Sequence, residues 1–362
     1  MAHNGLCIIN NIPTPYRRAL FDQLAEMAAV NDIEFSVLYI ANSETTRAWK
    51  VKVRSFERVL PVIWQKRNPS TATSDVVVNY RFLSKGFRPR LVILFGYNYP
   101  TYLAVAVLRA VARRPTGLFC ETTLSDKPTA AWKMALKSLI FKYLFDRFLV
   151  PGQRSAEYLQ AHGVKSDYIF TARNASPLQP QALPAPSQGP GLRILFVGRL
   201  APEKRITDFA RVFCGVETED RLTIVGSGPE AETIAEIANG VSNINVLGAR
   251  EPHELSQIYA RHDVLVLVSE SEPWGMVVNE AVNHGLALLL SPHVGCVPDL
   301  LEGNGVCIND LSVKSLSKAL DFIRENLDDF RTRSILIAET ASVEGQAASF
   351  LKFAAYFDEM KG

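Results

Sequence analysis

Two carboxylates separated by seven residues, Glu272 and Glu280, stand on either side of a Pro-Trp-Gly turn in this chain. The apolar run 264–268 before them predicts a buried strand, and Pro273 and Gly275 predict a turn into a helix that begins near Gly275. Glu272 then lies in the loop, and Glu280 lies inside the helix. The first N–H groups of a helix favour an anion. This pattern therefore suits a ligand that carries both phosphate and hydroxyl groups, such as a nucleotide sugar.

A second group of candidate ligands follows another apolar run. Residues 193–197 predict a buried strand that ends at Gly198, where the backbone can approach a ligand closely. Arg199 offers a planar fork of donors, and Lys204 offers a compact positive charge. Cations just past the carboxyl end of a parallel strand lie where open α/β sheets bind ligands. We expect these two side chains to neutralise a diphosphate and to stabilise it as a leaving group.

Two glycine loops follow further expected strands. Gly226 belongs to a Gly-Ser-Gly turn after the strand at 222–225, and residues 291–299 form a loop after the strand at 287–290. Gly226 is a candidate ligand contact, but a turn-forming role explains it equally well, because many αβ units turn on glycine. Trp274 is expected to pack at the edge of the site.

The motifs Gly-Arg-x4-Lys, Val-Gly-x-Gly-Pro-Glu, Glu-x-x-Gly-x4-Glu-Ala and Ser-x3-Gly follow one another over residues 192–310. In this order they resemble the family 4 retaining glycosyltransferases, which have the GT-B fold of two Rossmann-like domains with parallel sheets facing a central cleft. The segment 13–21 looks like the opening of bacterial polysaccharide-assembly members. The resemblance implies transfer of a sugar from a nucleoside-diphosphate sugar to a glycan or lipid-linked acceptor in O-antigen, capsule or exopolysaccharide synthesis.

The resemblance also implies how the residues are used. The acceptor hydroxyl attacks from the front face with retention, without a cofactor or metal, and the donor carries UDP or GDP. Catalysis falls to Glu272, Arg199 and Lys204, and Glu280 binds the ribose hydroxyls. The expected donor-binding residues are Gly198, Arg199, Lys204, Gly226, Glu272, Trp274, Gly275, Met276, Val277 and Glu280.

The chain departs from the family pattern in its first half. Many members carry a histidine near the reaction centre after the strand that corresponds to 117–120, whereas this chain has Glu121 there. No catalytic histidine is assigned, and Glu121 is the candidate for that place. Tyr16 and Arg17, at the start of the first expected helix, are candidate acceptor contacts. The loop 10–15 also lacks the Gly-Gly of many members, and Cys296 stands where many have a second glycine.

Alternating strands and helices predict a parallel sheet covered on both faces in each half. Expected strands lie at 6–10, 33–40, 91–96, 117–121, 148–151, 194–197, 222–225, 245–247, 264–268 and 287–290. Expected helices of the first half lie at 16–29, 99–113, 130–145 and 153–162. Residues 177–191 hold five prolines and predict a linker between an acceptor-binding domain, 1–176, and a donor-binding domain, 192–343. The GT-B fold implies that the helix at 344–362 packs back on the first domain, although an ordinary C-terminal amphipathic helix fits the spacing equally well.

Charge divides between the halves. Residues 1–176 carry 24 Lys and Arg against 12 Asp and Glu, or +12, and residues 177–362 carry 15 against 25, or −10. The basic half predicts contact with an anionic membrane surface or a phosphate-bearing acceptor, although a solvated basic surface is a further reading. Nucleic acid is not expected, because no binding motif accompanies the charge. The basic clusters are 17–18, 50–58, 66–67 and 81–90.

Five scattered cysteines, without a Cys-x-x-Cys pair, fit a reducing cytosol. We expect no signal peptide and no membrane-spanning segment, which predicts a cytoplasmic protein that is peripheral on the inner membrane face. The apolar segment 131–145 carries three lysines. A buried helix with snorkelling lysines is the favoured reading, and an interfacial or acceptor-binding helix is the alternative.

Two other functions fit the same motifs. One is a GT-B epimerase or phosphorylase that needs no sugar acceptor, and the other is a non-catalytic nucleotide-sugar-binding subunit, which the missing histidine favours. A small cytosolic acceptor is a variant of the main reading. The base, the sugar, the acceptor with its linkage and the oligomeric state are not encoded in any of these motifs.

Overall fold

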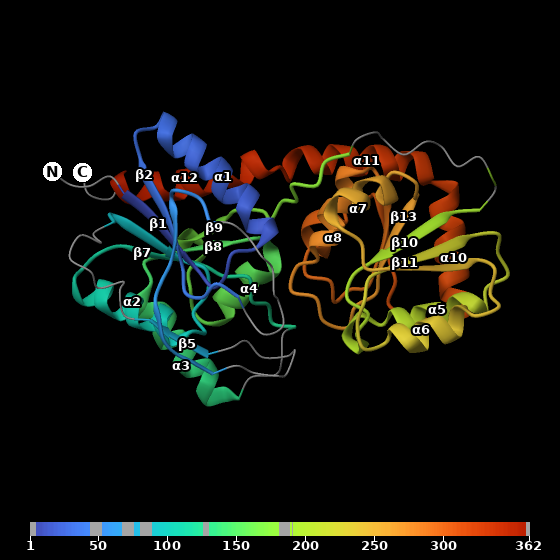
Figure 1. The fold of residues 1–362 in the computed structure, drawn as a ribbon, viewed down its shortest axis with the longest axis horizontal. Coiled ribbons are helices and arrows are strands. Elements are labelled where there is room, and N and C mark those ends of the chain that lie inside the picture. The colour runs from blue at the N-terminus through green and yellow to red at the C-terminus, as the bar shows by residue number, and fades with distance from the viewer. Residues whose placement is uncertain are drawn as a thin grey trace. The chain divides into compact units, whose positions relative to one another are not determined.

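The computed structural model describes residues 5–43, 53–66, 76–79, 89–125, 130–180, 189 and 191–359. The chain divides into two compact units, coloured mainly blue to green and yellow to orange in Figure 1. Unit 1 comprises residues 1–122, 128–173 and 343–362, and unit 2 comprises 123–127 and 174–342. Much of the basic clusters at 50–58, 66–67 and 81–90 lies outside the described residues.

Unit 1 is built on a seven-stranded parallel sheet of order β3-β2-β1-β6-β7-β8-β9. Its strands are β1 (Gly5–Asn10), β2 (Glu34–Tyr39), β3 (Glu57–Val59), β6 (Leu91–Leu94), β7 (Thr116–Phe119), β8 (Arg147–Val150) and β9 (Ile169–Thr171). Its helices are α1 (Pro15–Val30), α2 (Pro100–Val111), α3 (Ala131–Leu144), α4 (Gln153–Ala161), the 3-10 helix η2 (Ser166–Tyr168) and α12 (Val343–Glu359). A small antiparallel pair, β4 (Val62–Lys66) with β5 (Val76–Asn79), contacts α2.

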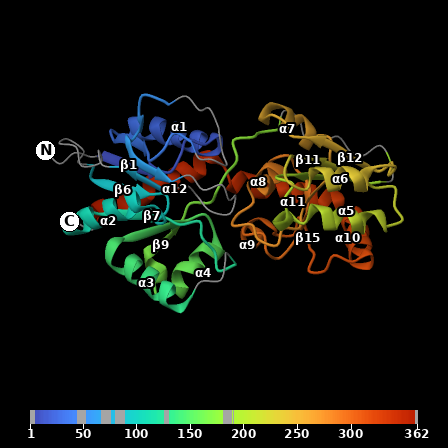
Figure 2. The ribbon, with the colours of Figure 1, turned by 60° about the horizontal axis from the view of Figure 1, so that its bottom comes forward.

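Alternation along the strands gives this sheet two apolar faces. In β1, Leu6 and Ile8 join a core with α1 and α12, whereas Cys7 and Ile9 join a core with α2, α3 and α4. Figure 2 shows α12 beside the strands of this sheet. Phe353 of α12 lies so close to the sheet that a Cβ on Gly117 would be 2.7 Å from its ring. The C-terminal helix is therefore an integral part of unit 1.

Unit 2 has a six-stranded parallel sheet of order β12-β11-β10-β13-β14-β15. Its strands are β10 (Arg193–Val197), β11 (Arg221–Val225), β12 (Ile244–Gly248), β13 (Val264–Leu267), β14 (Ala287–Leu290) and β15 (Gly305–Cys307). Its helices are η3 (Pro202–Lys204), α5 (Ile206–Cys214), α6 (Ala231–Ala238), α7 (Pro252–Tyr259), α8 (Met276–Asn283), α9 (Val297–Leu300), α10 (Val313–Glu325) and α11 (Leu327–Thr340). The strand order reverses between β10 and β13, and ligands of open α/β sheets bind at such a switch point, past the carboxyl ends of the strands.

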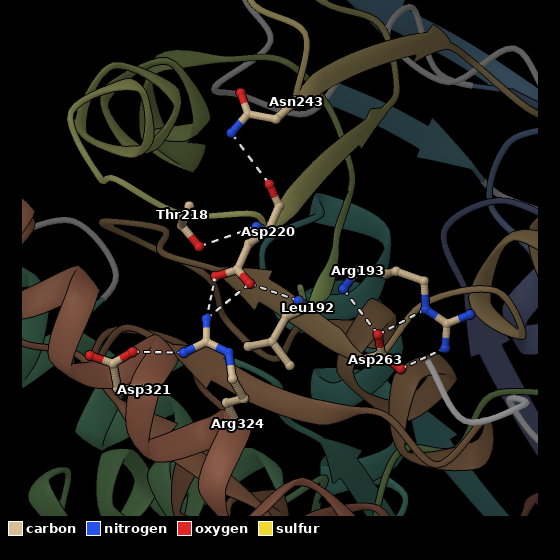
Figure 3. A network of polar contacts seen from close by, with 8 residues as sticks. All are labelled: Leu192, Arg193, Thr218, Asp220, Asn243, Asp263, Asp321 and Arg324. Atoms are coloured by element: carbon tan, nitrogen blue, oxygen red, sulfur yellow. Dashed lines mark hydrogen bonds and ion pairs between the residues drawn. The ribbon is translucent and has the colours of Figure 1, made fainter. Parts of the chain in front are cut away.

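Buried ion pairs fix the opposite, amino edge of this sheet (Figure 3). Asp263 is fully buried and accepts from the Arg193 backbone N–H and from both arms of its guanidinium, at 2.6–3.0 Å. Asp220 is also fully buried, and it accepts from the Leu192 backbone N–H at 2.7 Å and from Arg324 at 3.0 Å. These acceptors satisfy backbone donors at the start of β10, next to the turns that precede β11 and β13.

The strands predicted from the sequence are all present, with ends within two residues of the expected ones. Short strands were not predicted: β3, β4, β5, β9 and β15 have three to five residues each. Each of these strands lies at the edge of a sheet or in the two-stranded pair, and its place is set by the neighbour with which it pairs.

The buried-helix prediction for 131–145 is wrong. Within α3 only Phe141 is buried, and four large apolar side chains are at least half exposed. Composition suggested burial, because a helix that is apolar nearly all round normally lies in a core. In unit 1 the sheet face beneath α3 is shared with α2 and α4, so α3 buries one side only. Among the described residues, no helix is long and apolar enough to cross a membrane.

Candidate functional site

The predicted lysine and the first predicted acid meet at the switch point of unit 2. Lys204 lies at the end of η3, after β10, and Glu272 lies in the loop after β13. Their side chains form an ion pair, and they are 17% and 16% exposed. The Glu270 N–H donates to the Glu203 carbonyl at 2.9 Å, which ties the two loops together. A positive and a negative group are thus held side by side at the edge where a ligand would bind.

Arg199 is on the same edge but has a different partner. Its guanidinium pairs with Glu203, and the two side chains are 44% and 39% exposed. An ion pair this exposed stabilises the fold by less than about 1 kcal/mol. An incoming phosphate can therefore replace Glu203 at small cost.

Gly226 has a structural role in the turn after β11. Its φ is +150°, and a Cβ there would lie 1.8 Å from the Gly198 carbonyl oxygen. The Leu200 N–H donates to the Ser227 carbonyl at 2.9 Å, so the loops after β10 and β11 lie backbone against backbone. This close packing is sufficient to explain the glycine at 226.

The predicted helix start near Gly275 is confirmed. Gly275 precedes α8 with a φ of +99°, a left-handed conformation that other residues adopt only with strain. Glu272 lies in the loop, and Glu280 lies at the fifth position of α8. The first N–H groups of α8, those of Met276 and Val277, lie beside this loop and can donate hydrogen bonds to an anion.

Glu280 is deeply buried, at 2% exposure, rather than open on the helix surface. The hydroxyl of Tyr259, in α7, donates to its Oε2 at 2.8 Å. Burial raises the pKa of Glu280 to about 7, and the Tyr259 hydroxyl acts in the opposite direction. His284 stacks on Tyr259 with ring centroids 5.0 Å apart, and its Nε2 lies 3.0 Å from the Ser256 hydroxyl.

This burial predicts a pH dependence of stability. Because the folded pKa of Glu280 is raised, the folded state binds an extra proton between about pH 4.5 and 7, and the contribution of this group to stability falls as pH rises through that window. We expect the wild type to lose up to about 1.4 kcal/mol of unfolding free energy per pH unit there, relative to Glu280→Gln. Urea unfolding from pH 5 to 8 measures the difference. Burial lowers the pKa values of His262 and His284, but both proteins contain them, so parallel curves contradict the prediction.

The Trp274 side chain packs inside unit 2 instead of lining an open surface. It is 5% exposed, and its indole N–H donates to Asn279 Oδ1 at 2.7 Å. Asn279 in turn donates to the Asn174 carbonyl at 2.7 Å, and Asn283 donates to the Leu178 carbonyl at 3.0 Å. Helix α8 therefore holds the segment by which the chain enters unit 2. Tyr259, Asn279 and Asn283 were not predicted, and the four-residue spacing of the two asparagines in an apolar helix was the one available signal.

In unit 1 the structure brings two predicted acceptor residues together. Arg17, in the first turn of α1, pairs with Glu121, just past β7, at 2.5 Å between Nη2 and Oε2. The guanidinium lies over the Phe95 and Phe119 rings at 5.2 and 5.0 Å from their centroids. Arg17 is 16% exposed and Glu121 is 42% exposed. The side chain of Tyr16 lies outside the described part of the structure.

An unpredicted hydroxyl cluster adjoins Glu121. Tyr97, after β6, bonds with Tyr158 at 2.8 Å and donates to Thr122 at 3.3 Å. Lys137 of α3 donates to the Tyr158 hydroxyl at 3.1 Å. His162 is buried in α4's C-terminal turn, with Nδ1 2.8 Å from the Tyr158 carbonyl, and is not at the sheet edge. In the described residues, no three His, Cys, Asp or Glu side chains gather as metal ligands.

Comparison with known proteins identifies the domain that carries Arg199, Lys204, Glu272 and Glu280. Residues 191–326 match the sequence profile of the family described as glycosyl transferases group 1. This part of unit 2 is therefore similar to the glycosyl transferases of group 1. Similar curated proteins include the O-antigen biosynthesis glycosyltransferase WbnH of Escherichia coli, which is 30% identical over 52% of this chain and 53% of the relative. A GDP-mannose-dependent α-mannosyltransferase of Mycobacterium tuberculosis is 32% identical over 44% of this chain and 42% of that protein.

Solved structures extend the likeness to the whole fold. HepE of Anabaena, in complex with UDP, superposes with a TM-score of 0.72 over 97% of this chain and 99% of that chain, at 14% identity. The chain thus has the GT-B fold, as the resemblance of its motifs implies. The sequence matches span about half the length of the curated relatives.

Proposed function

We propose that this protein is a retaining glycosyltransferase that moves a sugar from a nucleoside-diphosphate sugar to a glycan or lipid-linked acceptor in bacterial polysaccharide synthesis. The observation that carries the proposal is the Lys204–Glu272 pair at the switch point of a glycosyl transferases group 1 domain. A cation and an acid at this edge match a ligand that presents a diphosphate beside sugar hydroxyls.

The donor is proposed to rearrange both ion pairs of the site. The diphosphate takes Lys204 from Glu272 and Arg199 from Glu203, and the freed Glu272 accepts from the sugar hydroxyls. The two cations supply the positive charge, so no metal is needed for this step. The acceptor hydroxyl attacks the anomeric carbon from the face that the diphosphate leaves. The bond between the anomeric carbon and the diphosphate oxygen breaks, and the proton of the acceptor hydroxyl passes to that oxygen.

The nucleoside is proposed to bind beside α8. Tyr259 holds one oxygen of Glu280, which leaves the other for a ribose hydroxyl. UDP and GDP are the candidate nucleotides, because HepE was solved with UDP and the mycobacterial relative is GDP-mannose-dependent. The acceptor is proposed to bind unit 1 at Arg17, in the first turn of α1, and at its ion-pair partner Glu121, which lies past β7 and is 42% exposed.

The proposal predicts that a nucleoside diphosphate stabilises the protein against unfolding and that this effect depends on Lys204. Thermal unfolding is measured with UDP, GDP, ADP and dTDP for the wild type, Lys204→Ala and the control Lys314→Ala, an exposed lysine of α10. One nucleotide at a hundredfold excess over its Kd should stabilise the wild type and the control by about 2.7 kcal/mol, and Lys204→Ala much less.

Two results contradict this proposal in different ways. Stabilisation by none of the four nucleotides removes the donor site. Binding of a nucleotide sugar with neither transfer to a glycan panel nor acceptor-dependent release of the nucleotide leaves the site but removes the transferase activity. Turnover without any acceptor indicates an epimerase or phosphorylase reaction instead.

A further inference from the structure

Helix α3 carries an exposed apolar stripe. Its four members are 50–66% exposed. They are Trp132, Leu136, Leu139 and Tyr143. Steps of four, three and four residues along a helix of 3.6 residues per turn place these side chains within about 60° of one another. Phe141, nine residues after Trp132, is half a turn away and is the buried residue of the helix. The stripe therefore points away from the core of unit 1.

Two exposed lysines flank this stripe. Lys133 lies with its Nζ 5.4 Å from the Trp132 ring centroid, and Lys142 lies 5.3 Å from that of Tyr143. At about 100° per residue, the two lysines fall on opposite sides of the stripe. The helix contains no acidic residue to offset them. Lys137 instead turns inward and donates to Tyr158.

We propose that this face of α3 docks on an anionic lipid bilayer, with the helix lying in the plane of the membrane surface. Leu136 and Leu139 enter the boundary between headgroups and acyl chains, and the two aromatic rings sit at headgroup depth, where their apolar bodies and polar edges are both solvated. Lys133 and Lys142 then extend sideways to lipid phosphates. An apolar stripe with a lysine on each side is complementary to an anionic bilayer, which offers apolar chains below negative headgroups. It is not complementary to a protein with a neutral or basic surface.

The docking places a lipid surface beside unit 1 and is independent of the donor chemistry. Lys137, which comes from the same helix, joins the hydroxyl cluster next to Glu121. If unit 1 binds the acceptor as proposed, helix α3 delivers that edge of the sheet to the membrane surface. The docking test uses lipid binding alone, so its outcome does not depend on whether the protein transfers sugar.

Vesicle co-sedimentation of the full chain tests the proposal. We expect binding to phosphatidylcholine vesicles that contain phosphatidylglycerol, weaker binding to phosphatidylcholine alone, and a decline at high salt. Trp132→Ser with Leu136→Ser and Leu139→Ser should weaken binding about 100-fold through lost apolar burial. Lys133→Gln with Lys142→Gln should weaken it about fivefold for each lysine. Because all five side chains are exposed, these variants retain the fold, which circular dichroism verifies.

A matched control comes from unit 2. Phe322 and Leu336 are 51% and 48% exposed there, and the variant Phe322→Ser with Leu336→Ser should bind vesicles like the wild type. Trp132 emission should also shift to shorter wavelength with anionic vesicles, and this shift should vanish in Trp132→Phe. The proposal is overturned if the triple variant of Trp132, Leu136 and Leu139 binds vesicles as well as the wild type does, or if the wild type does not bind them. The wild type could instead self-associate with increasing concentration and not bind vesicles. If the triple serine variant of α3 loses that self-association, the stripe contacts a second copy of the chain, and the membrane proposal is overturned.

Discussion

Lys204→Ala is expected to lower kcat for sugar transfer by about 100- to 1,000-fold, with the fold intact. Under the proposed mechanism, Lys204 holds the charge that develops on the departing diphosphate, and removing one such preorganised group costs about 2.7–4 kcal/mol of transition-state stabilisation. The alanine variant also leaves Glu272 without its cation, so the acid repels the leaving group. Steady-state assays with the nucleotide found by thermal shift measure kcat and KM separately.

The division between kcat and KM distinguishes this role from simple binding. A loss confined to KM indicates that Lys204 contacts the donor equally in the ground state and the transition state. Lys204→Arg keeps the charge but changes its geometry, and should recover part of the lost rate. Lys314→Ala serves as the matched control, because it removes a lysine from an exposed position of the same unit. An unchanged kcat in Lys204→Ala refutes the leaving-group role.

Asp263→Ala is expected to lower the free energy of unfolding of unit 2 by about 3–5 kcal/mol. Asp263 is fully buried and accepts three hydrogen bonds from Arg193, one of them from the backbone N–H that begins β10. Its removal leaves that N–H and a 29% exposed guanidinium without their acceptor. Since β10 is a central strand, the loss affects the whole sheet. Urea unfolding followed by fluorescence of Trp274, the tryptophan of unit 2, measures the change.

Asp321→Ala provides the comparison for this second prediction. Asp321 also pairs with an arginine in the network of Figure 3, at 2.7 Å to Arg324, but its side chain is 61% exposed. Its loss should cost less than about 1 kcal/mol, because exposed ion pairs contribute little. Equal effects of the two alanine variants contradict the assignment of the stability to burial. Asp263→Asn should give an intermediate value, since the amide keeps one acceptor oxygen.

Local patterns in the sequence predicted the elements around the candidate site well. The apolar runs before Gly198 and Glu272 are β10 and β13, and the turn at Pro273 leads into α8. Such features depend on neighbours in the chain: strand length, a glycine with positive φ, and the first turn of a helix. The rule that ligands bind past the carboxyl ends of parallel strands placed Lys204 at the candidate site, but the ion pair of Lys204 with Glu272 was not predicted.

Features that depend on tertiary packing were not predictable. Tyr259 reaches Glu280 from a helix on another part of the sheet, and no spacing in the sequence joins these two residues. The burial of Glu280 likewise arises from the surrounding helices, so its raised pKa was not anticipated. The prediction that helix α3 is buried was wrong for a related reason. Composition gives the apolar content of a helix, whereas its exposure depends on how many neighbours share the same sheet face.

The place of α12 in the chain has a consequence for synthesis on the ribosome. Helix α12 belongs to unit 1, and its Phe350 and Phe353 are fully buried in the core between α1 and the sheet. Residues 343–359 nevertheless leave the ribosome after all of unit 2. The unit that starts first is therefore completed last, and the growing chain carries an unfilled apolar face on β1 and β7 while unit 2 folds. A nascent chain in that state is a substrate for chaperones that hold exposed apolar surface.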